Sequence, residues 1–136
     1  MTARPVIGIA TDGAHSSMGR LTRFQAVDLS TGEMLFSESV GNLTNNCGEF
    51  LGLVEAIKYI LEHENSPRII YTDSTAAIAW IGNRKPVSTK RSAALLKAEV
   101  FLKIMEERIR DIQIIHWDNR LWGEIPGDFA NKNKHK

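Results

Sequence analysis

Four acidic side chains stand where predicted strands end or predicted helices begin, namely Asp12, Glu49, Asp73 and Asp128. Acids gathered at the ends of apolar strands raise one another's pKa, so a cluster of them is costly unless a cation neutralises it. Several carboxylate oxygens that converge on one point are typical of a Mg²⁺ or Mn²⁺ site, because zinc prefers His and Cys ligands. If folding brings these four side chains together, the sequence predicts a site for a hard divalent cation.

Each acid also has an ordinary structural interpretation. The Asp-Gly dipeptide that begins at Asp12 is common in turns. Glu49 and Asp128 could offset the dipoles of helices that begin beside them. Asp73 could cap a helix that begins near Ser74. No single structural need accounts for all four acids together.

Three strands are predicted in the first part of the chain. Residues 6–10 form a short apolar run that leads into a turn at residues 11–13. Residues 23–29 and 33–40 are rich in β-forming side chains, and the Ser-Thr-Gly turn between them indicates a hairpin. The first three strands are therefore expected to form an antiparallel meander.

Helices alternate with two further strands in the rest of the chain. A helical period covers residues 50–61, and Thr44, Asn45 or Asn46 could cap that helix. A strand, two helices and a last strand follow at residues 68–72, 74–81, 88–110 and 111–117, and Asp128 opens a short terminal helix. The second of these helices is predicted to face inward with Leu96, Val100, Phe101, Ile104 and Met105.

This order of elements predicts an α/β fold with a five-stranded mixed sheet. Strand–helix–strand steps need a right-handed crossover and parallel pairing, so parallel strands follow the antiparallel three and helices cover both faces. Ligands of such sheets bind at the carboxyl ends of parallel strands. If the first and fourth strands lie side by side, Asp12 and Asp73 emerge at the same edge.

The composition of the 136-residue chain indicates a folded protein. Hydrophobic residues make up 43% and charged residues 24%, which excludes a wholly disordered chain. The length fits one domain over residues 1–136, with residues 131–136 as a frayed tail. The single cysteine, Cys47, favours a reducing, cytoplasmic location. The apolar runs are too short to span a bilayer, and the N-terminus leads into a predicted core strand without a signal peptide.

The charge is uneven along the chain. Residues 1–68 carry 5 basic and 8 acidic side chains, which gives −3, whereas residues 69–136 carry 12 and 8, which gives +4. No acid lies between Asp73 and Glu99, but this stretch holds five basic residues: Arg84, Lys85, Lys90, Arg91 and Lys97. Such a stretch could bind a polyphosphate, or it could be a solvated loop and helix face.

Short motifs surround the four acids and occur in a definite order. They are Thr11-Asp12-Gly13-Ala14, Thr44-Asn-Asn-Cys-Gly-Glu49-Phe, Tyr71-Thr-Asp73-Ser74 and Gly127-Asp128-Phe-Ala130. In this order they resemble type 1 ribonuclease H, and the resemblance extends from residue 6 to residue 131. The run at residues 122–129, Trp-Gly-Glu-Ile-Pro-Gly-Asp-Phe, is similar to a branch of the family typical of bacteria such as the Bacteroidetes.

The resemblance implies a ribonuclease H-like fold and an endonuclease that cuts the RNA strand of RNA–DNA hybrids, leaving 3′-hydroxyl and 5′-phosphate ends. It makes Asp12, Glu49, Asp73 and Asp128 the catalytic, metal-binding carboxylates of two Mg²⁺ ions, for which Mn²⁺ can substitute. Two cations about 4 Å apart can activate a water and stabilise the departing 3′ oxygen. The implied partner is the hybrid, with no membrane and no obligate protein partner.

Several further residues match places where the family contacts its substrate. Asn45 and Asn46 stand where the family reads the minor groove, although capping the helix is an equal alternative for them. Gly13 and Ser74, beside the metal acids, could approach the nucleic-acid backbone. The remaining matches, at the place of a basic protrusion that is abbreviated here, are Arg84, Lys85, Lys90 and Arg91.

One departure from the family pattern concerns a loop histidine shortly before the last acid. Its place falls near Asp118, and the nearest histidine, His116, is as readily a half-buried structural residue of its strand. Asp118 and Glu124 are the candidates to compensate for the missing histidine. Trp117 and Trp122 are expected to pack in the interior rather than stack on bases.

Two other functions stay open. One is a non-catalytic nucleic-acid-binding module that has kept the fold, which the missing histidine and the short basic region favour. The other is a different nuclease on the same fold, such as a resolvase or an exonuclease.

Overall fold

Residues 3–129 are described by the computed structural model, and their strands form one mixed sheet. The sheet order is β3-β2-β1-β4-β5, with antiparallel pairing of β1, β2 and β3 and parallel pairing of β4 with β1 and β5. The strands are β1 (Ile9–Ser16), β2 (Leu21–Asp28), β3 (Met34–Ser39), β4 (Ile69–Thr72) and β5 (Gln113–His116). The mixed sheet predicted from the order of elements is confirmed.

Five helices occur within the described residues: α1 (Asn45–Glu62), α2 (Thr75–Gly82), α3 (Ala93–Ile104), α4 (Glu106–Ile109) and α5 (Asn119–Trp122). The long helix predicted at residues 88–110 is wrong in its extent, because it begins at Ala93 and is interrupted at Met105. No part of residues 3–129 forms a helix long and apolar enough to cross a membrane. The predicted tail at 131–136 lies outside the described residues, as does all but the start of the helix predicted at Asp128.

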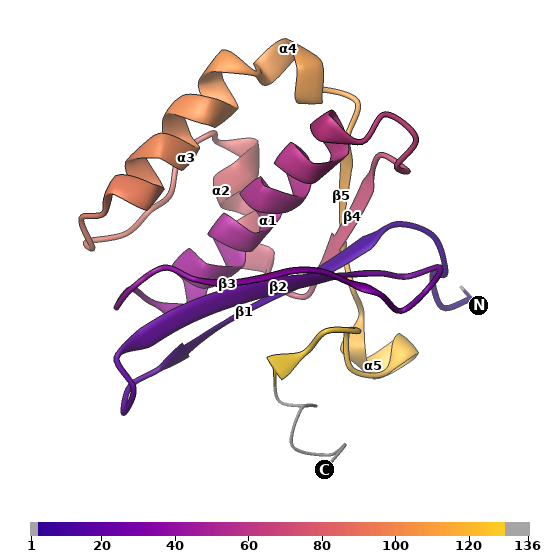
Figure 1. Ribbon diagram of the computed structural model, residues 1–136, viewed down its shortest axis with the longest axis horizontal. Coiled ribbons are helices and arrows are strands. Elements are labelled where there is room, and N and C mark those ends of the chain that lie inside the picture. The colour runs from indigo at the N-terminus through magenta and orange to yellow at the C-terminus, as the bar shows by residue number, and fades with distance from the viewer. Residues whose placement is uncertain (1–2, 130–136) are drawn as a thin grey trace.

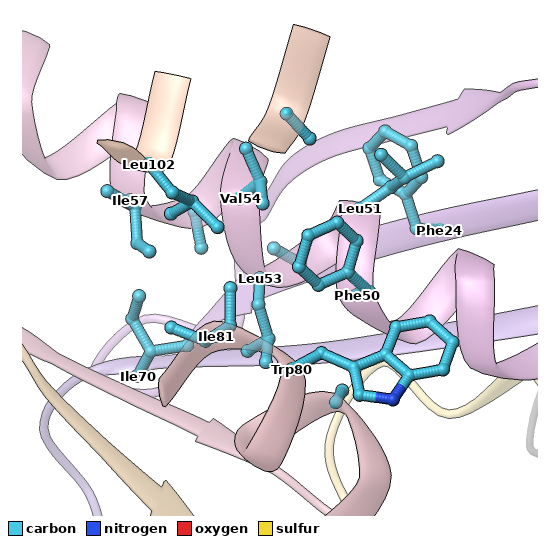
Figure 2. Close-up of a cluster of buried hydrophobic side chains, with 14 of the residues drawn as sticks. Phe24, Phe50, Leu51, Leu53, Val54, Ile57, Ile70, Trp80, Ile81 and Leu102 are labelled. Atoms are coloured by element: carbon cyan, nitrogen blue, oxygen red, sulfur yellow. The ribbon is translucent and has the colours of Figure 1, made fainter. Parts of the chain in front are cut away.

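Alternation along the central strands gives the sheet two apolar faces. Ile9 and Ile70 belong to a first core that packs under α1, α2 and α3, and Figure 2 shows part of it. Their neighbours Ala10 and Tyr71 belong to a second core on the opposite face, together with Trp117. The long helices lie on one side of the sheet and α5 on the other (Figure 1). Helices on both faces are thus confirmed.

Two glycines let α1 lie close to the antiparallel strands. A Cβ atom at Gly52 would lie 3.1 Å from the Cβ of Phe24, and one at Gly48 would lie 3.0 Å from the carbonyl oxygen of Arg23. Larger side chains at these positions would push the helix outward. The N-terminal part of α1, which carries Glu49, is therefore held against β1 and β2.

The inward face predicted for α3 is wrong for three of its five residues. Leu96, Val100 and Ile104 are 64%, 46% and 74% exposed, whereas the buried residues of α3 are Leu95, Ala98 and Leu102. The predicted Phe101 and Met105 are partly buried against the first core. The reason is that α3 packs on α1 rather than directly on the sheet, so it buries only a narrow stripe.

Candidate metal centre

Asp12 lies inside β1, which corrects the prediction of a turn directly after a strand at residues 6–10. Pairing with β2 continues from Ile9 to Ser16 and keeps the chain extended through Asp12. Parallel pairing with β4 is shorter and ends at Ala10 opposite Tyr71. Asp12 therefore stands just beyond the end of the parallel pair, and the residue is only 6% exposed.

Glu49, the fifth residue of α1, reaches β1 from the N-terminal part of this helix. The hydroxyl oxygen of Thr44 accepts a hydrogen bond from the Cys47 N–H, so Thr44 is the cap of this helix. The carboxylate of Glu49 accepts a hydrogen bond of 2.8 Å from the Gly13 N–H. Gly13 lies past the end of the pairing between β1 and β4, which stops at Ala10. Glu49 thus faces the sheet and is fixed to the residue that follows Asp12.

Asp73 follows β4 directly and opens the turn into α2. The cap of α2 is Ser74, whose hydroxyl oxygen accepts from the Ala77 N–H at 3.1 Å. The interpretation of Asp73 as a helix cap is therefore wrong. Its carboxylate instead accepts a hydrogen bond of 3.0 Å from the side-chain amide of Asn119.

Three of the four predicted acids meet at one point. Asp12, Glu49 and Asp73 each offer a carboxylate oxygen, and these oxygens lie within 4.8 Å of one another. They come from a strand, a helix and a strand end that are far apart in sequence. Among the described residues, Asp128 is not a member of this three-acid cluster.

Asp128 approaches the cluster on a segment that is tied to β1 and β2. The backbone N–H of its neighbour Phe129 donates to the carboxylate of Asp12 at 2.9 Å. The buried amide of Gln25 donates to the carbonyl oxygen of Gly127. Asp128 is near enough for its charge to raise the pKa of Asp12. The fourth acid therefore borders the cluster.

Burial and mutual repulsion raise the pKa of two of these acids to neutral pH or above. Burial is the main cause that raises the pKa of Asp12 to about 7, and the charges of Asp73 and Asp128 add to it. Burial, followed by the charges of Asp12 and Asp73, raises the pKa of Glu49 to about 9. A divalent cation would remove this repulsion, and a donor set made only of carboxylate oxygens suits Mg²⁺ or Mn²⁺. The residues present therefore fit such an ion.

The metal-free protein is expected to lose stability as the pH rises. Asp12 and Glu49 bind protons more tightly in the folded chain, with pKa values of about 7 and about 9, than their ordinary values of 3.8 and 4.5. The unfolded chain therefore releases these protons first, and the free energy of unfolding falls as the pH passes from about 4 through the folded pKa values.

Glu49→Gln removes the larger of these shifts and keeps an oxygen that can accept from Gly13. We expect it to raise the free energy of unfolding at about pH 9 by at least about 2 kcal/mol and to change it little at about pH 4. Urea unfolding of the EDTA-treated proteins at both pH values measures the difference. An effect of equal size at both pH values would contradict this explanation.

Asn45 and Asn46, the two asparagines predicted to read a groove, directly follow Thr44, and neither of them caps α1. The side-chain oxygen of Asn45 accepts a hydrogen bond of 2.6 Å from the backbone N–H of His15. The side-chain oxygen of Asn45 is therefore used within the fold. Asn45 and Asn46 are both exposed in the first turn of α1, shortly before Glu49.

The predicted basic residues separate into two groups. Arg84 is half-buried, and its guanidinium donates to the carbonyl oxygen of Ile81 at 2.7 Å and pairs with Glu106 at 3.3 Å. The other three line a groove of about 400 Å³ at the start of α3, and they are Lys85, Lys90 and Arg91. None of the clustered acids lines this groove.

The residues considered in place of the loop histidine lie at the end of β5 and in the segment after it. His116 is exposed at the end of β5, not half-buried, and Glu124 is exposed as well. Asp118 caps α5, because one of its carboxylate oxygens accepts from the N–H groups of Arg120 and Leu121. Trp117 is fully buried and donates its indole N–H to the carbonyl oxygen of Gly123, which confirms that it packs in the interior.

Sequence reasoning missed two side chains that shape the site, Gln25 and Asn119. Gln25 is 1% exposed and lies opposite Asp12 in the β1–β2 pairing. A polar residue inside the buried run of β2 was the available signal for it. Asn119 lies in a polar stretch with no distinguishing pattern, so only its contacts identify it.

The fold is shared with solved structures of other proteins, although no protein-family model matches the chain. LC11-RNase H1, isolated from compost by a metagenomic approach, has a TM-score of 0.57 at 20% identity, covering 83% of this chain and 84% of that chain. RNase H1 from the halophilic archaeon Halobacterium salinarum has a TM-score of 0.56 at 15% identity, covering 96% and 98%. LC11-RNase H1 in complex with an RNA/DNA hybrid has a TM-score of 0.50 at 16% identity, covering 92% and 97%. The chain therefore has an RNase H-like fold.

Proposed function

We propose that this chain is a single-domain, divalent-metal-dependent endonuclease that hydrolyses the RNA strand of RNA–DNA hybrids. The observation that carries the proposal is the three-acid cluster, in which three carboxylates from distant elements converge within 4.8 Å at a largely buried point. The RNase H-like fold supports it, as does the structure of LC11-RNase H1 with an RNA/DNA hybrid. The acids stand in the family's order along the chain.

The proposed metal ligands are Asp12, Glu49, Asp73 and Asp128, which would hold two Mg²⁺ ions or Mn²⁺ in their place. Such a pair of ions supplies an activated water on one side of the phosphate and charge stabilisation of the departing 3′ oxygen on the other. The chain contributes orientation, because the N–H groups of Phe129 and Gly13 hold the carboxylates of Asp12 and Glu49. Ligands fixed in advance need no reorganisation during the reaction.

Recognition of the hybrid is assigned to residues outside the three-acid cluster. Asn45 presents amide N–H donors and Asn46 lies beside it, in keeping with probing the minor groove and its 2′-hydroxyl groups. Gly13 and Ser74 are proposed to approach the backbone of the substrate. The lysines and arginine of the basic groove, Lys85, Lys90 and Arg91, are proposed to contact phosphates, whereas Arg84 holds α2 to α4 through Glu106.

Competition among nucleic acids in one assay tests the proposal. The protein is incubated with a hybrid whose RNA strand is labelled, together with duplex DNA, single-stranded RNA or a four-way junction, in Mg²⁺, Mn²⁺ or EDTA. We expect repeated cutting of the hybrid RNA to 3′-hydroxyl ends, and no cutting in EDTA. A preference for the junction would overturn the substrate, and salt-sensitive binding without turnover in either metal would favour a non-catalytic module.

Two finer predictions accompany the proposal. The lone Cys47, which is fully buried, fits a reducing cytoplasmic location. The motif around Trp122 and Asp128 is the reason to place the chain in a Bacteroidetes-like branch of bacterial type 1 ribonucleases H.

A further inference from the structure

Asn119, the first residue of α5, bridges the three-acid cluster and the segment that leads to Asp128. Its side-chain nitrogen donates to the carboxylate of Asp73 at 3.0 Å. Its side-chain oxygen accepts from the backbone N–H of Ile125 at 3.1 Å. The two bonds join groups that are 46 and 6 residues away along the chain.

Only one orientation of the Asn119 carboxamide satisfies both partners. The Ile125 N–H needs an acceptor and the Asp73 carboxylate needs a donor, so exchanging the oxygen and nitrogen would break both bonds. Ile125 is fully buried in the second core beside Trp117. The amide that holds Asp73 is thus itself anchored in the interior.

The anchored end also positions the fourth acid. The N–H of Asp128 donates to the carbonyl oxygen of Ile125 at 3.0 Å, so Asp128 is placed relative to the same residue that Asn119 binds. Phe129, the next residue, donates to Asp12 at 2.9 Å. A single amide therefore connects Asp73 with the chain that carries Asp128 and contacts Asp12.

We propose that Asn119 is a positioning residue of the metal centre: it fixes the carboxylate of Asp73 and the Ile125–Asp128 segment relative to each other. A carboxylate held by an N–H donor has its oxygens in set directions before an ion arrives, which is how outer hydrogen-bond partners support metal ligands. The inference rests on the proposed function. It assigns a role to a residue that is not among the proposed metal ligands or hybrid-binding residues.

Titration of the metal-free protein with Mn²⁺, followed by the electron paramagnetic resonance of the free ion, tests this role without substrate. Asn119→Ala is expected to weaken Mn²⁺ binding about 10-fold, in the range found for lost outer partners of metal ligands. The matched control is Asp118→Ala, which removes the cap of α5 and loosens the same segment while leaving both Asn119 bonds possible. At about 0.15 M salt, which screens the lost Asp118 charge, the control is expected to bind Mn²⁺ within about twofold of wild type.

Comparison of the two variants distinguishes a positioning role of Asn119 from a general loosening of α5 and the segment after it. If both variants weaken Mn²⁺ binding equally, or if Asn119→Ala binds like wild type, the proposal is wrong. Cleavage kinetics give a second readout: a positioning residue should lower kcat and leave the KM for the hybrid nearly unchanged. A wild type that binds Mn²⁺ but cuts no hybrid would overturn only the proposed function, whereas a wild type that binds no Mn²⁺ would overturn both.

Discussion

Asp12→Asn is expected to slow cleavage of the hybrid by about 10²–10³-fold, the range seen when one preorganised electrostatic contact is removed. Asparagine has the shape of aspartate and keeps an oxygen that can accept from the Phe129 N–H. It lacks the negative charge that an Asp12 carboxylate offers to a cation. The rate of single-turnover cleavage in Mg²⁺ measures the effect.

A loss of folding would not account for this result. Burial and neighbouring acids raise the pKa of Asp12 to about 7. Its charged carboxylate therefore destabilises the folded, metal-free protein above that pH. Asp12→Asn should therefore unfold at an equal or higher urea concentration in EDTA. The matched control is Asp111→Asn, which removes an exposed acid paired with Arg68 and should cut at the wild-type rate. Equal cleavage by Asp12→Asn and wild type would show that the cluster is not the active centre.

Gly13→Ala is expected to lower the free energy of unfolding by about 2–3 kcal/mol, as overpacking of a well-packed contact does. A Cβ atom at Gly13 would lie 2.4 Å from the backbone nitrogen of Glu49 and 2.4 Å from the carbonyl carbon of Gly48. Both are backbone atoms of α1, so the N-terminal part of the helix must move. The same movement would break the bond from the Gly13 N–H to the Glu49 carboxylate. Gly13→Ala should therefore lower both the free energy of unfolding, measured in urea, and the affinity for Mn²⁺, measured by titration.

Gly82→Ala is the matched control for this substitution. Nothing lies within 4 Å of a Cβ atom at Gly82, which is the last residue of α2. The added methyl group should leave Mn²⁺ binding unchanged and the stability equal or slightly higher, since alanine is the better helix former. If Gly13→Ala were as stable as Gly82→Ala, the close approach of α1 to β1 would be wrong.

The order of elements and the identity of the acids were predictable from the sequence, because both depend on signals a few residues long. The hairpin of β2 and β3, the crossover helices and the position of β4 follow from local hydrophobic periods and turn residues. The cap of α1 at Thr44 was one of three local candidates, whereas the cap of α2 is Ser74 and not the predicted Asp73. The acids that follow β4 and lie near the start of α1 could therefore be identified from sequence as candidate metal ligands.

Contacts between distant residues decided the rest. Pairing with β2 turned the expected bend at Asp12 into continuous strand, and the position of α1 selected Ala98 rather than Leu96 as the inward face of α3. The approach of Asp128 depends on Gln25 and Asn119, whose partners Gly127 and Asp73 lie 102 and 46 residues away. A local hydrophobic period predicts whether a residue is buried or exposed. Only the tertiary structure determines which distant residue it contacts. The cluster of carboxylates is therefore a property of the tertiary structure. The sequence could predict the candidate residues but not their convergence.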